Sequence, residues 1–432
     1  MKVKIRWLFT LILLVAFAFN LQAPLQGVHT IRQSDTTFAS YSYCIEKTEF
    51  LKPKVAHRGA TSGTAIGEFP LYSYLMSLPC QLRGSWSELD PKFLILLLWI
   101  LNMMVWLAWA KIYLKPHEPS AFGVLLGFST FSLLFMTIAL PDNLGFFLIG
   151  LAAFLHQRFP QKKISILTSL LFILAFAIRP YLIPLILLVH RRWLWMLLTT
   201  FGCLLVYVLW YKFWVQQSEL NYYYLAIPPI SEIFATFPNY AVPLFKTILR
   251  EWFQFVFIFL LVWKWRSLKA LEVFGVFGSL ALVILVRGEH LVIHSYYLWA
   301  AAVFTFLCLF RALMTLSKKQ QAVALIGYGI IGFAQTQHEF HRQAFFKAQE
   351  VQNILQTEKI PADAKIAVYV GDGSCSTQYL YWMKHFGWCF YEKDFKGPDH
   401  CPKGADYYFK YDMDLPILKP CESVPTDKPT DK

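Results

Sequence analysis

The chain has 432 residues, of which 56% are hydrophobic, 18% are aromatic and 16% are charged, and its formal net charge is +13 at pH 7. A single soluble core of this length cannot bury so much apolar surface, so the composition excludes an ordinary soluble protein and indicates a membrane protein. Nucleic acid is not an expected partner, because the Lys and Arg residues lie between apolar runs and do not form one basic patch.

The first apolar run extends from Trp7 to about Leu21 and follows Lys2, Lys4 and Arg6. This pattern is typical of a first transmembrane helix or of a signal peptide. Under either interpretation, the chain that follows lies on the outer side of the membrane.

Later breaks between apolar runs are alternately rich and poor in Lys and Arg. The basic breaks are residues 111–115, 158–163, 191–192, 264–269 and 311–319, and the others lie near Pro141, Arg179 and residues 287–290. Since cytoplasmic loops are enriched in Lys and Arg, the alternation predicts about eleven spans with the non-basic breaks outside. The segments beside Arg179 and Pro180 are short, so one kinked helix is the alternative to two spans; the charges of Arg191 and Arg192 favour two.

The predicted fold is therefore a polytopic α-helical membrane protein with a small C-terminal α/β domain on the periplasmic side. The transmembrane domain covers residues 1–335, with a large first outer loop at 24–91; the α/β domain covers 336–418 and a disordered tail covers 419–432. Strands are expected at 365–370 and 405–411, a helix at 375–385 and a turn at 371–374.

Two helices are predicted in the first outer loop, each next to a carboxylate. Residues 36–44 place Phe38 and Tyr41 on one helical face directly after Asp35, and a second helix begins after Glu68 with Pro70 in its first turn. Asp35 is either an N-cap or a functional acid, and Glu68 either favours the helix terminus or acts on a substrate.

Two carboxylates in one outer loop suit the transfer of a group onto a hydroxyl. One ionised carboxylate accepts the proton of the attacking hydroxyl, while the second orients it. A departing phosphate needs cations or hydrogen-bond donors. The outer candidates for this role are Arg32, Arg179, Arg287, His290, His294, Tyr296 and Tyr297. The alternative for the histidines and tyrosines is an interfacial position in the aromatic belt.

Most cysteines fall in outer segments, where disulfides can form. The outer six are Cys44, Cys80, Cys375, Cys389, Cys401 and Cys421, whereas Cys203 and Cys308 lie in spans. Their spacing does not match a zinc pattern and does not define the pairing.

Asp412-Met413-Asp414 has the form found in metal-dependent nucleotide-sugar transferases, but its domain is too small for a nucleotide-binding fold. A divalent metal remains open as a cofactor.

Several short motifs, in this order, carry a resemblance to a known family. They are Arg32-Gln33-Ser34-Asp35-Thr36, Glu68-Phe69-Pro70-Leu71-Tyr72, Pro141-Asp142-Asn143 and His294-Ser295-Tyr296-Tyr297, followed by Val370-Gly371-Asp372-Gly373 and Phe386-Gly387-Trp388. Together they resemble the lipid-linked-sugar glycosyltransferases of the GT-C fold, the superfamily of protein O-mannosyltransferases and lipid A aminoarabinose transferase. Its bacterial members often have Arg-Gln-Ala-Asp-Thr as the first motif.

The resemblance implies a polyprenyl-phosphate sugar donor, undecaprenyl in bacteria, and transfer with inversion to an extracytoplasmic lipid, glycan or protein acceptor. It also implies a bacterial inner-membrane location with the active site on the periplasmic side. Asp35 matches the catalytic acid and Glu68 a second acid, while Arg32, Gln33 and Tyr72 match positions beside the substrate.

One position departs from the family pattern, since an acid usually follows the histidine of the late motif and this chain has Ser295. The acceptor or metal that such an acid helps to hold is therefore expected to differ. Two other classes compete with this interpretation. A lipid-linked oligosaccharide polymerase or ligase would have its large outer loop later in the chain, and a flippase would have polar residues lining a path through its spans.

Overall fold

The computed structural model describes most of the chain after residue 29. The described ranges are 30–58, 61–65, 68–115, 119–129, 138–190, 192–219, 256–287, 295–342, 363–369, 378–390, 401–412 and 415–421, with isolated positions between them. The first apolar run, the turn at 371–374 and residues 422–432 lie outside them. The disordered tail was predicted to start at 419, but β4 (Leu415–Pro420) and the disulfide of Cys421 show that this start is wrong. Two compact units are present. The helical unit comprises Met1–Leu21, Pro91–Gln216 and Tyr223–Phe340, and the loop-and-sheet unit comprises Gln22–Asp90, Gln217–Tyr222 and His341–Lys432.

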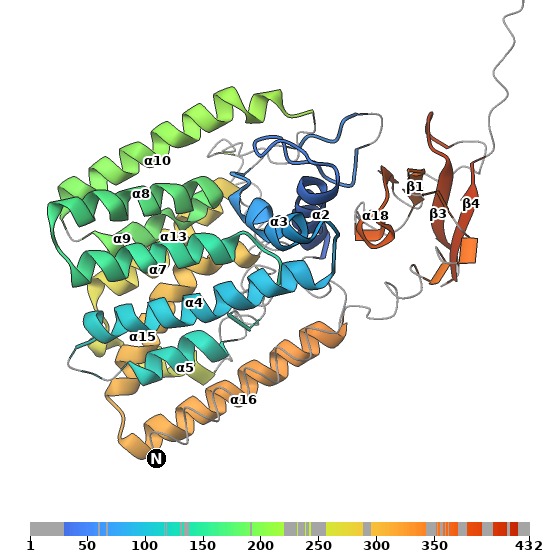
Figure 1. The fold of residues 1–432 in the computed structure, drawn as a ribbon. Coiled ribbons are helices and arrows are strands. Elements are labelled where there is room, and N and C mark those ends of the chain that lie inside the picture. Colours follow the sequence, from blue (N-terminus) through green and yellow to red (C-terminus); the bar gives the residue numbers. More distant parts are fainter. Residues whose placement is uncertain are drawn as a thin grey trace, which may run out of the picture. The chain divides into compact units, whose positions relative to one another are not determined.

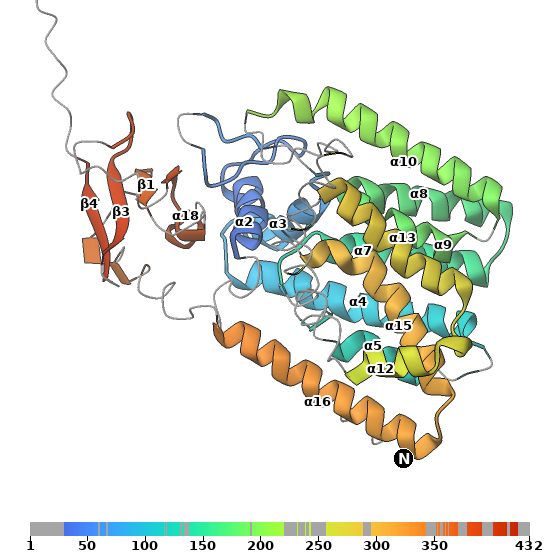
Figure 2. The same ribbon diagram turned by 180° about the vertical axis from the view of Figure 1, so that it is seen from behind.

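The helical unit consists of apolar helices packed against one another (Figures 1 and 2). They are α4 (Leu89–Tyr113), α5 (Ser120–Phe128), α7 (Asp142–Arg158), α8 (Lys162–Ile178), α9 (Ile186–Val189), α10 (Trp193–Phe213), α12 (Val256–Trp263), α13 (Ala270–Arg287), α15 (Trp299–Met314) and α16 (Lys318–Arg342). α7 lies beside α8, α8 beside α10, and α13 beside α15.

Aromatic rings fill the centre of the helical unit. Trp106 of α4 stacks on Phe146 of α7 with ring centroids 4.6 Å apart, and Phe146 packs on Trp299 of α15 at 4.5 Å. All three side chains are fully buried. A β-carbon at Gly150 would lie 2.7 Å from Trp106 Nε1, so glycine allows α7 to approach α4 closely.

Two described helices, α4 and α10, are long and apolar enough to cross a membrane. α10 is only slightly covered by other helices, and large apolar side chains project from it. These include Trp193, Leu197, Phe201, Leu204 and Val208. Shorter apolar helices lie at Pro180–Val189, Ala270–Leu285 and Trp299–Met314. The total of about eleven spans stays a prediction.

The chain reverses direction at Arg179. After α8 ends at Ile178, the 3-10 helix η1 (Pro180–Leu185) and then α9 return beside α8 and α7. His190 follows α9, and its Nε2 lies 3.2 Å from the Ser169 hydroxyl in the middle of α8. A single helix would separate these two residues by roughly 30 Å. The structure therefore has two helical segments here and not one kinked helix.

Three basic breaks meet at one end of the helical unit. Glu272, near the start of α13, accepts hydrogen bonds from Arg311 of α15 at 3.3 Å and from Tyr113 of α4 at 3.4 Å. Two of the non-basic breaks likewise meet, through an ion pair between Asp142 and Arg179. This grouping agrees with the predicted alternation, in which breaks of one kind share one side of the membrane.

The loop-and-sheet unit contains both predicted loop helices. α2 (Thr30–Ile45) begins six residues before the predicted start, while α3 (Leu71–Arg83) begins directly after Pro70, close to its prediction. Gly84 ends α3 in the left-handed conformation, with its N–H donating to the Cys80 carbonyl.

A four-stranded sheet follows in the same unit. Its order is β2-β1-β3-β4, with β1 (Lys365–Tyr369) parallel to β2 (Phe386–Phe390) and β3 (Tyr407–Asp412), and β3 antiparallel to β4 (Leu415–Pro420). The short helix α18 (Gln378–Met383) connects β1 to β2. The expected strands β1 and β3 are confirmed, whereas β2 and β4 were not predicted.

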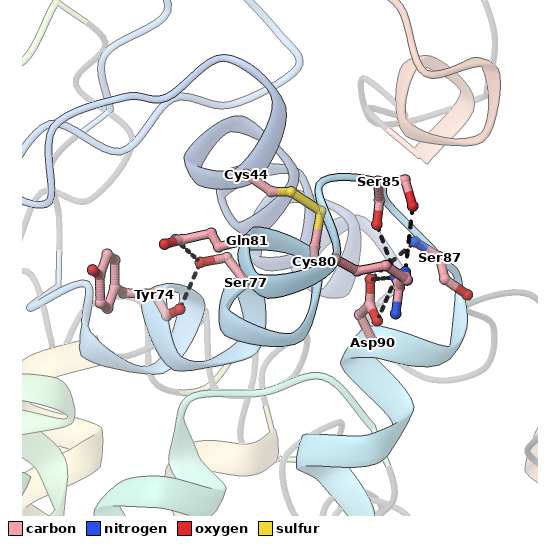
Figure 3. The surroundings of a disulfide bond; sticks show 9 residues. Cys44, Tyr74, Ser77, Cys80, Gln81, Ser85, Ser87 and Asp90 are labelled. Atoms are coloured by element: carbon pink, nitrogen blue, oxygen red, sulfur yellow. Dashed lines mark hydrogen bonds and ion pairs between the residues drawn. A yellow bond between two sulfur atoms is a disulfide. The ribbon is translucent and has the colours of Figure 1, made fainter.

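Disulfides and backbone bonds stabilise this unit. Cys44 at the end of α2 is joined to Cys80 of α3 (Figure 3), and Cys401 is joined to Cys421. The first loop also reaches the sheet, since the Arg58 N–H donates to the Gly387 carbonyl of β2. The described free cysteines, Cys203 and Cys308, are buried in the helical unit.

Glu88 ties the end of the first loop to α18. Its carboxylate lies 2.6 Å from the Lys384 ammonium and accepts a hydrogen bond from the Tyr381 hydroxyl at 2.9 Å. Burial alone would raise the pKa of Glu88, but Lys384 and the hydrogen bonds hold that pKa below its ordinary value. The carboxylate therefore stabilises this contact most when it is ionised.

We expect Glu88→Gln to lower the free energy of unfolding at neutral pH by about 1–2 kcal/mol, since the pair is partly exposed. Because the folded-state pKa of Glu88 is depressed, the contribution of Glu88 to stability is present above pH 4.5. This contribution is lost as the pH falls through the folded-state pKa. The difference from wild type should narrow in acid, as measured by thermal unfolding and hydrogen exchange of α18. Glu49→Gln, in an exposed pair with Lys52, is the matched control and should change little.

Candidate functional site

Helix α2 carries the first motif and is buried although most of its residues are polar. Its hydroxyls donate to carbonyls of the preceding turn: Thr36 Oγ1 to Arg32 O at 2.9 Å, and Thr37 Oγ1 to Gln33 O at 2.7 Å. Ser40 bonds the carbonyl of Thr36 in the same way. These bonds satisfy the hydroxyls inside the protein, so polar residues of the helix can be buried together with its apolar ones.

Asp35 lies inside α2, in its second turn, and is 4% exposed. The N-cap alternative is therefore wrong, because an N-cap residue must precede the helix. Asp35 is also three residues after Arg32, so the two side chains share a helical face. A buried carboxylate in mid-helix has no capping role, and the catalytic role of Asp35 stays a prediction.

Arg32 forms an ion pair with Glu68, the first residue of the second motif. The Arg32 side chain is 8% exposed and that of Glu68 is 19% exposed. The structure thus joins the two motifs, which are 36 residues apart in sequence. Because the charge of Glu68 is neutralised by Arg32, Glu68 fits an orienting role better than that of a general base.

Gln33 and Tyr72, the other predicted residues of this unit, are also buried. Gln33 lies on α2 and Tyr72 in the first turn of α3, and each is 1% exposed. α2 packs directly against α3, and the Cys44–Cys80 disulfide fixes the two helices to each other. Figure 3 shows this bridge, with Ser85, Ser87 and Asp90 beyond it. The first motif and Tyr72 thus lie on two covalently joined helices.

A second polar group lies in the helical unit and includes the Pro-Asp-Asn motif. Asp142 Oδ2, at the start of α7, is 2.8 Å from Arg179 Nε, and both side chains are nearly inaccessible. Asn102 of α4 donates to the Asn143 carbonyl at 2.9 Å. These contacts join α4, α7 and the turn after α8. They give the buried polar groups partners that apolar neighbours could not supply.

Tyr297 of the late motif packs next to this second polar group. Its ring meets that of Tyr181 edge-on, with centroids 4.9 Å apart. Tyr297 and Tyr296 belong to the 3-10 helix η4 (Ser295–Leu298), and Arg287 is the last residue of α13. His290 and His294 lie outside the described residues, so their predicted roles are not tested.

The sequence interpretation missed the partnership of Asp142 with Arg179. Arg179 was expected to face a phosphate, but its Nε is bonded to a buried carboxylate. The signal that could have found the pair is the charge alternation, because both residues lie at non-basic breaks and hence on the same predicted side.

The described residues contain no cluster of three or more His, Cys, Asp or Glu side chains that could hold a metal ion. Asp412 ends β3, and the rest of the Asp-x-Asp sequence lies outside the described part of the chain.

The fold is thus a set of apolar helices together with a polar first loop and a small mixed sheet. No protein-family model matches the chain, and no curated protein matches it in sequence. Among solved structures, it is similar to ArnT from Cupriavidus metallidurans bound to undecaprenyl phosphate, with a TM-score of 0.60 and 11% identity over 90% of this chain and 86% of that one. The apo structure of the same protein aligns with a TM-score of 0.49 and 11% identity, over 89% and 85%.

The likeness to the ligand-bound structure shows a shared fold. The mostly helical fold expected from the sequence is thus the fold of ArnT, whereas the number of spans and the separate C-terminal domain stay predictions. The alignment covers most of the length of both chains.

The Arg32–Glu68 ion pair can be tested by a double-mutant cycle. Glu68→Gln removes one charge of a buried ion pair, so it should destabilise the protein, as should Arg32→Gln. The double variant should recover part of the loss, with a coupling of about 1–3 kcal/mol in the free energy of unfolding. Additive effects of the two substitutions would contradict the pairing.

Proposed function

We propose that this chain is a membrane glycosyltransferase that moves a sugar from a polyprenyl-phosphate donor to an extracytoplasmic acceptor. The observation that carries the proposal is the shared fold, over nine-tenths of the chain, with ArnT crystallised with undecaprenyl phosphate; the motifs that resemble lipid-linked-sugar glycosyltransferases support it. An undecaprenyl donor is the corresponding lipid carrier for this chain. The acceptor is a hydroxyl group of a lipid, a glycan or a protein.

The proposed chemistry is a single displacement at the anomeric carbon of the sugar. Asp35 takes the proton of the acceptor hydroxyl as its oxygen bonds to that carbon. The bond between the carbon and the phosphate oxygen breaks, and its electron pair leaves with the polyprenyl phosphate. One displacement inverts the anomeric configuration. Asp35 suits the role because it is buried in mid-helix, so packing holds its carboxylate in place.

The remaining predicted residues would bind substrate around this step. Arg32, held by Glu68, and the buried Gln33 and Tyr72 support donor or acceptor binding beside Asp35. Cations and hydrogen-bond donors of the later segment would stabilise the leaving phosphate. These are Arg287, His290, His294, Tyr296 and Tyr297.

The proposed location is the bacterial inner membrane, with several passes and with the active site and C-terminus on the periplasmic side. Both disulfides between described cysteines belong to the loop-and-sheet unit, which supports an oxidising environment for that unit. The buried free thiols of the helical unit agree with positions inside the membrane.

The chemistry is tested with purified, detergent-solubilised protein and labelled synthetic polyprenyl-phosphate sugars. Wild type should transfer the sugar to an acceptor panel or slowly hydrolyse the donor. Asp35→Asn keeps the shape of the side chain but removes the base, so turnover should fall by about 100- to 10,000-fold while donor binding is retained. Asp363→Asn, at an exposed position, is the matched control and should retain activity.

Near-normal turnover in a folded Asp35→Asn protein would contradict the assignment of the base. Glu68→Gln should weaken turnover less than Asp35→Asn, because Glu68 orients Arg32 in the proposed site. Donor binding by wild type without any Asp35-dependent chemistry, over the whole acceptor panel, would instead favour a lipid-sugar flippase.

A further inference from the structure

A short turn between α12 and α13 exposes two tryptophans beside three cations. The 3-10 helix η3 (Trp265–Ser267) forms the turn, and Trp263 and Trp265 are 66% and 64% exposed. Tryptophan is rarely this exposed in a folded protein unless its ring contacts another phase or a partner. We call residues 263–269 the basic-aromatic turn.

Each cation of the basic-aromatic turn lies over an aromatic ring. Lys264 Nζ is 3.8 Å from the ring centroid of Trp263, and Arg266 Cζ is 5.7 Å from that of Trp265. Lys269 Nζ lies 5.7 Å from the ring of Tyr113, near the end of α4. Such stacking holds the cations close to the rings without neutralising their charge.

The charges of this turn are not compensated within the described part of the chain. None of Lys264, Arg266 and Lys269 forms an ion pair with a described carboxylate. The nearby acid Glu272 is fully buried and binds Arg311 instead. Lys115, at the exposed end of α4, adds a further positive charge on the same side. Figure 2 shows the α12–α13 turn near this end of α4.

We propose that the basic-aromatic turn binds the phosphate headgroup of an anionic phospholipid in the cytoplasmic leaflet. Exposed tryptophans at the end of an apolar helix are expected at the level of lipid headgroups, and uncompensated Lys and Arg side chains bind a phosphodiester. The turn is one of the basic breaks, which the charge alternation places on the cytoplasmic side. This site is distinct from the proposed transfer site, which lies on the opposite side of the membrane.

The expected strength follows from the number of cations. Each Lys or Arg near an anionic surface favours binding, and three of them together correspond to a preference on the order of a hundredfold over a zwitterionic lipid. The exposed rings add contact with the lipid that depends little on headgroup charge. Removing the charges should therefore abolish the preference for anionic lipid but keep weak binding.

The test uses the purified full-length protein in detergent. Native mass spectrometry measures the binding of phosphatidylglycerol and of phosphatidylcholine with identical acyl chains, and thermal unfolding follows the stabilisation. Wild type should prefer phosphatidylglycerol by about a hundredfold. The variant Lys264→Gln/Arg266→Gln/Lys269→Gln should lose that preference. If it does not fold, the single exposed Arg266→Gln variant should lose about fivefold.

A matched control removes three charges from another basic break. Arg158→Gln/Lys162→Gln/Lys163→Gln changes exposed residues that have no tryptophan next to them in the sequence, and it should keep the wild-type preference. An equal loss in this control would reduce the effect to general attraction by positive charge and would overturn the site. Trp263→Leu/Trp265→Leu should weaken phosphatidylglycerol binding with all charges present; unchanged binding would also overturn it.

Free phosphate is the alternative occupant of the same cations. Inorganic phosphate without lipid should leave the unfolding temperature unchanged and should not compete with phosphatidylglycerol at equal concentration. Stabilisation by phosphate alone that disappears in the triple variant would contradict a lipid site. These results do not depend on glycosyl transfer, since none of the altered residues belongs to the proposed active site.

Discussion

An unpaired charge inside an apolar helical unit costs several kcal/mol, and the arrangement of the helical unit follows from this cost. Its two described buried ion pairs, Asp142–Arg179 and Glu272–Arg311, each join residues near helix ends. Each pair connects two residues that lie more than 30 positions apart in the sequence. The pairs therefore help to fix which helix ends meet, and they leave the middle of the helices to apolar packing around Trp106.

In the loop-and-sheet unit, buried polar and charged groups also need partners, but they find them in a different way. Helix α2 is buried with mostly polar residues, which its own carbonyls and the partner charge of Glu68 satisfy. Precise polar geometry of this kind costs stability unless every group is paired, and the Cys44–Cys80 disulfide limits the motion that would break it. A catalytic carboxylate needs such a rigid setting, because a small displacement of the base reduces the rate strongly.

The sequence was informative where one physical signal dominated. Alternating side chains predicted β1 and β3, and Pro70 marked the start of α3. The start of α2 was missed because residues 30–35 have no apolar period, since polar bonds and not an apolar face hold them. β4 was missed because Pro416 and Pro420 argue against a central strand, although they are tolerated on an edge. The Arg32–Glu68 and Asp142–Arg179 pairs depend on tertiary packing, which residue spacing does not reveal.

Ion pairing also distinguishes cations with a structural role from cations whose charge is available to a ligand. Arg179 was a candidate binding group in the sequence and Arg311 belonged to a basic break, yet each is paired with a buried acid. Lys264, Arg266 and Lys269 have aromatic neighbours in place of acids, so their charge reaches the surface. The proposed transfer site and the basic-aromatic turn belong to breaks of opposite kind in the predicted charge alternation. Their cations would therefore not compete for the same headgroups.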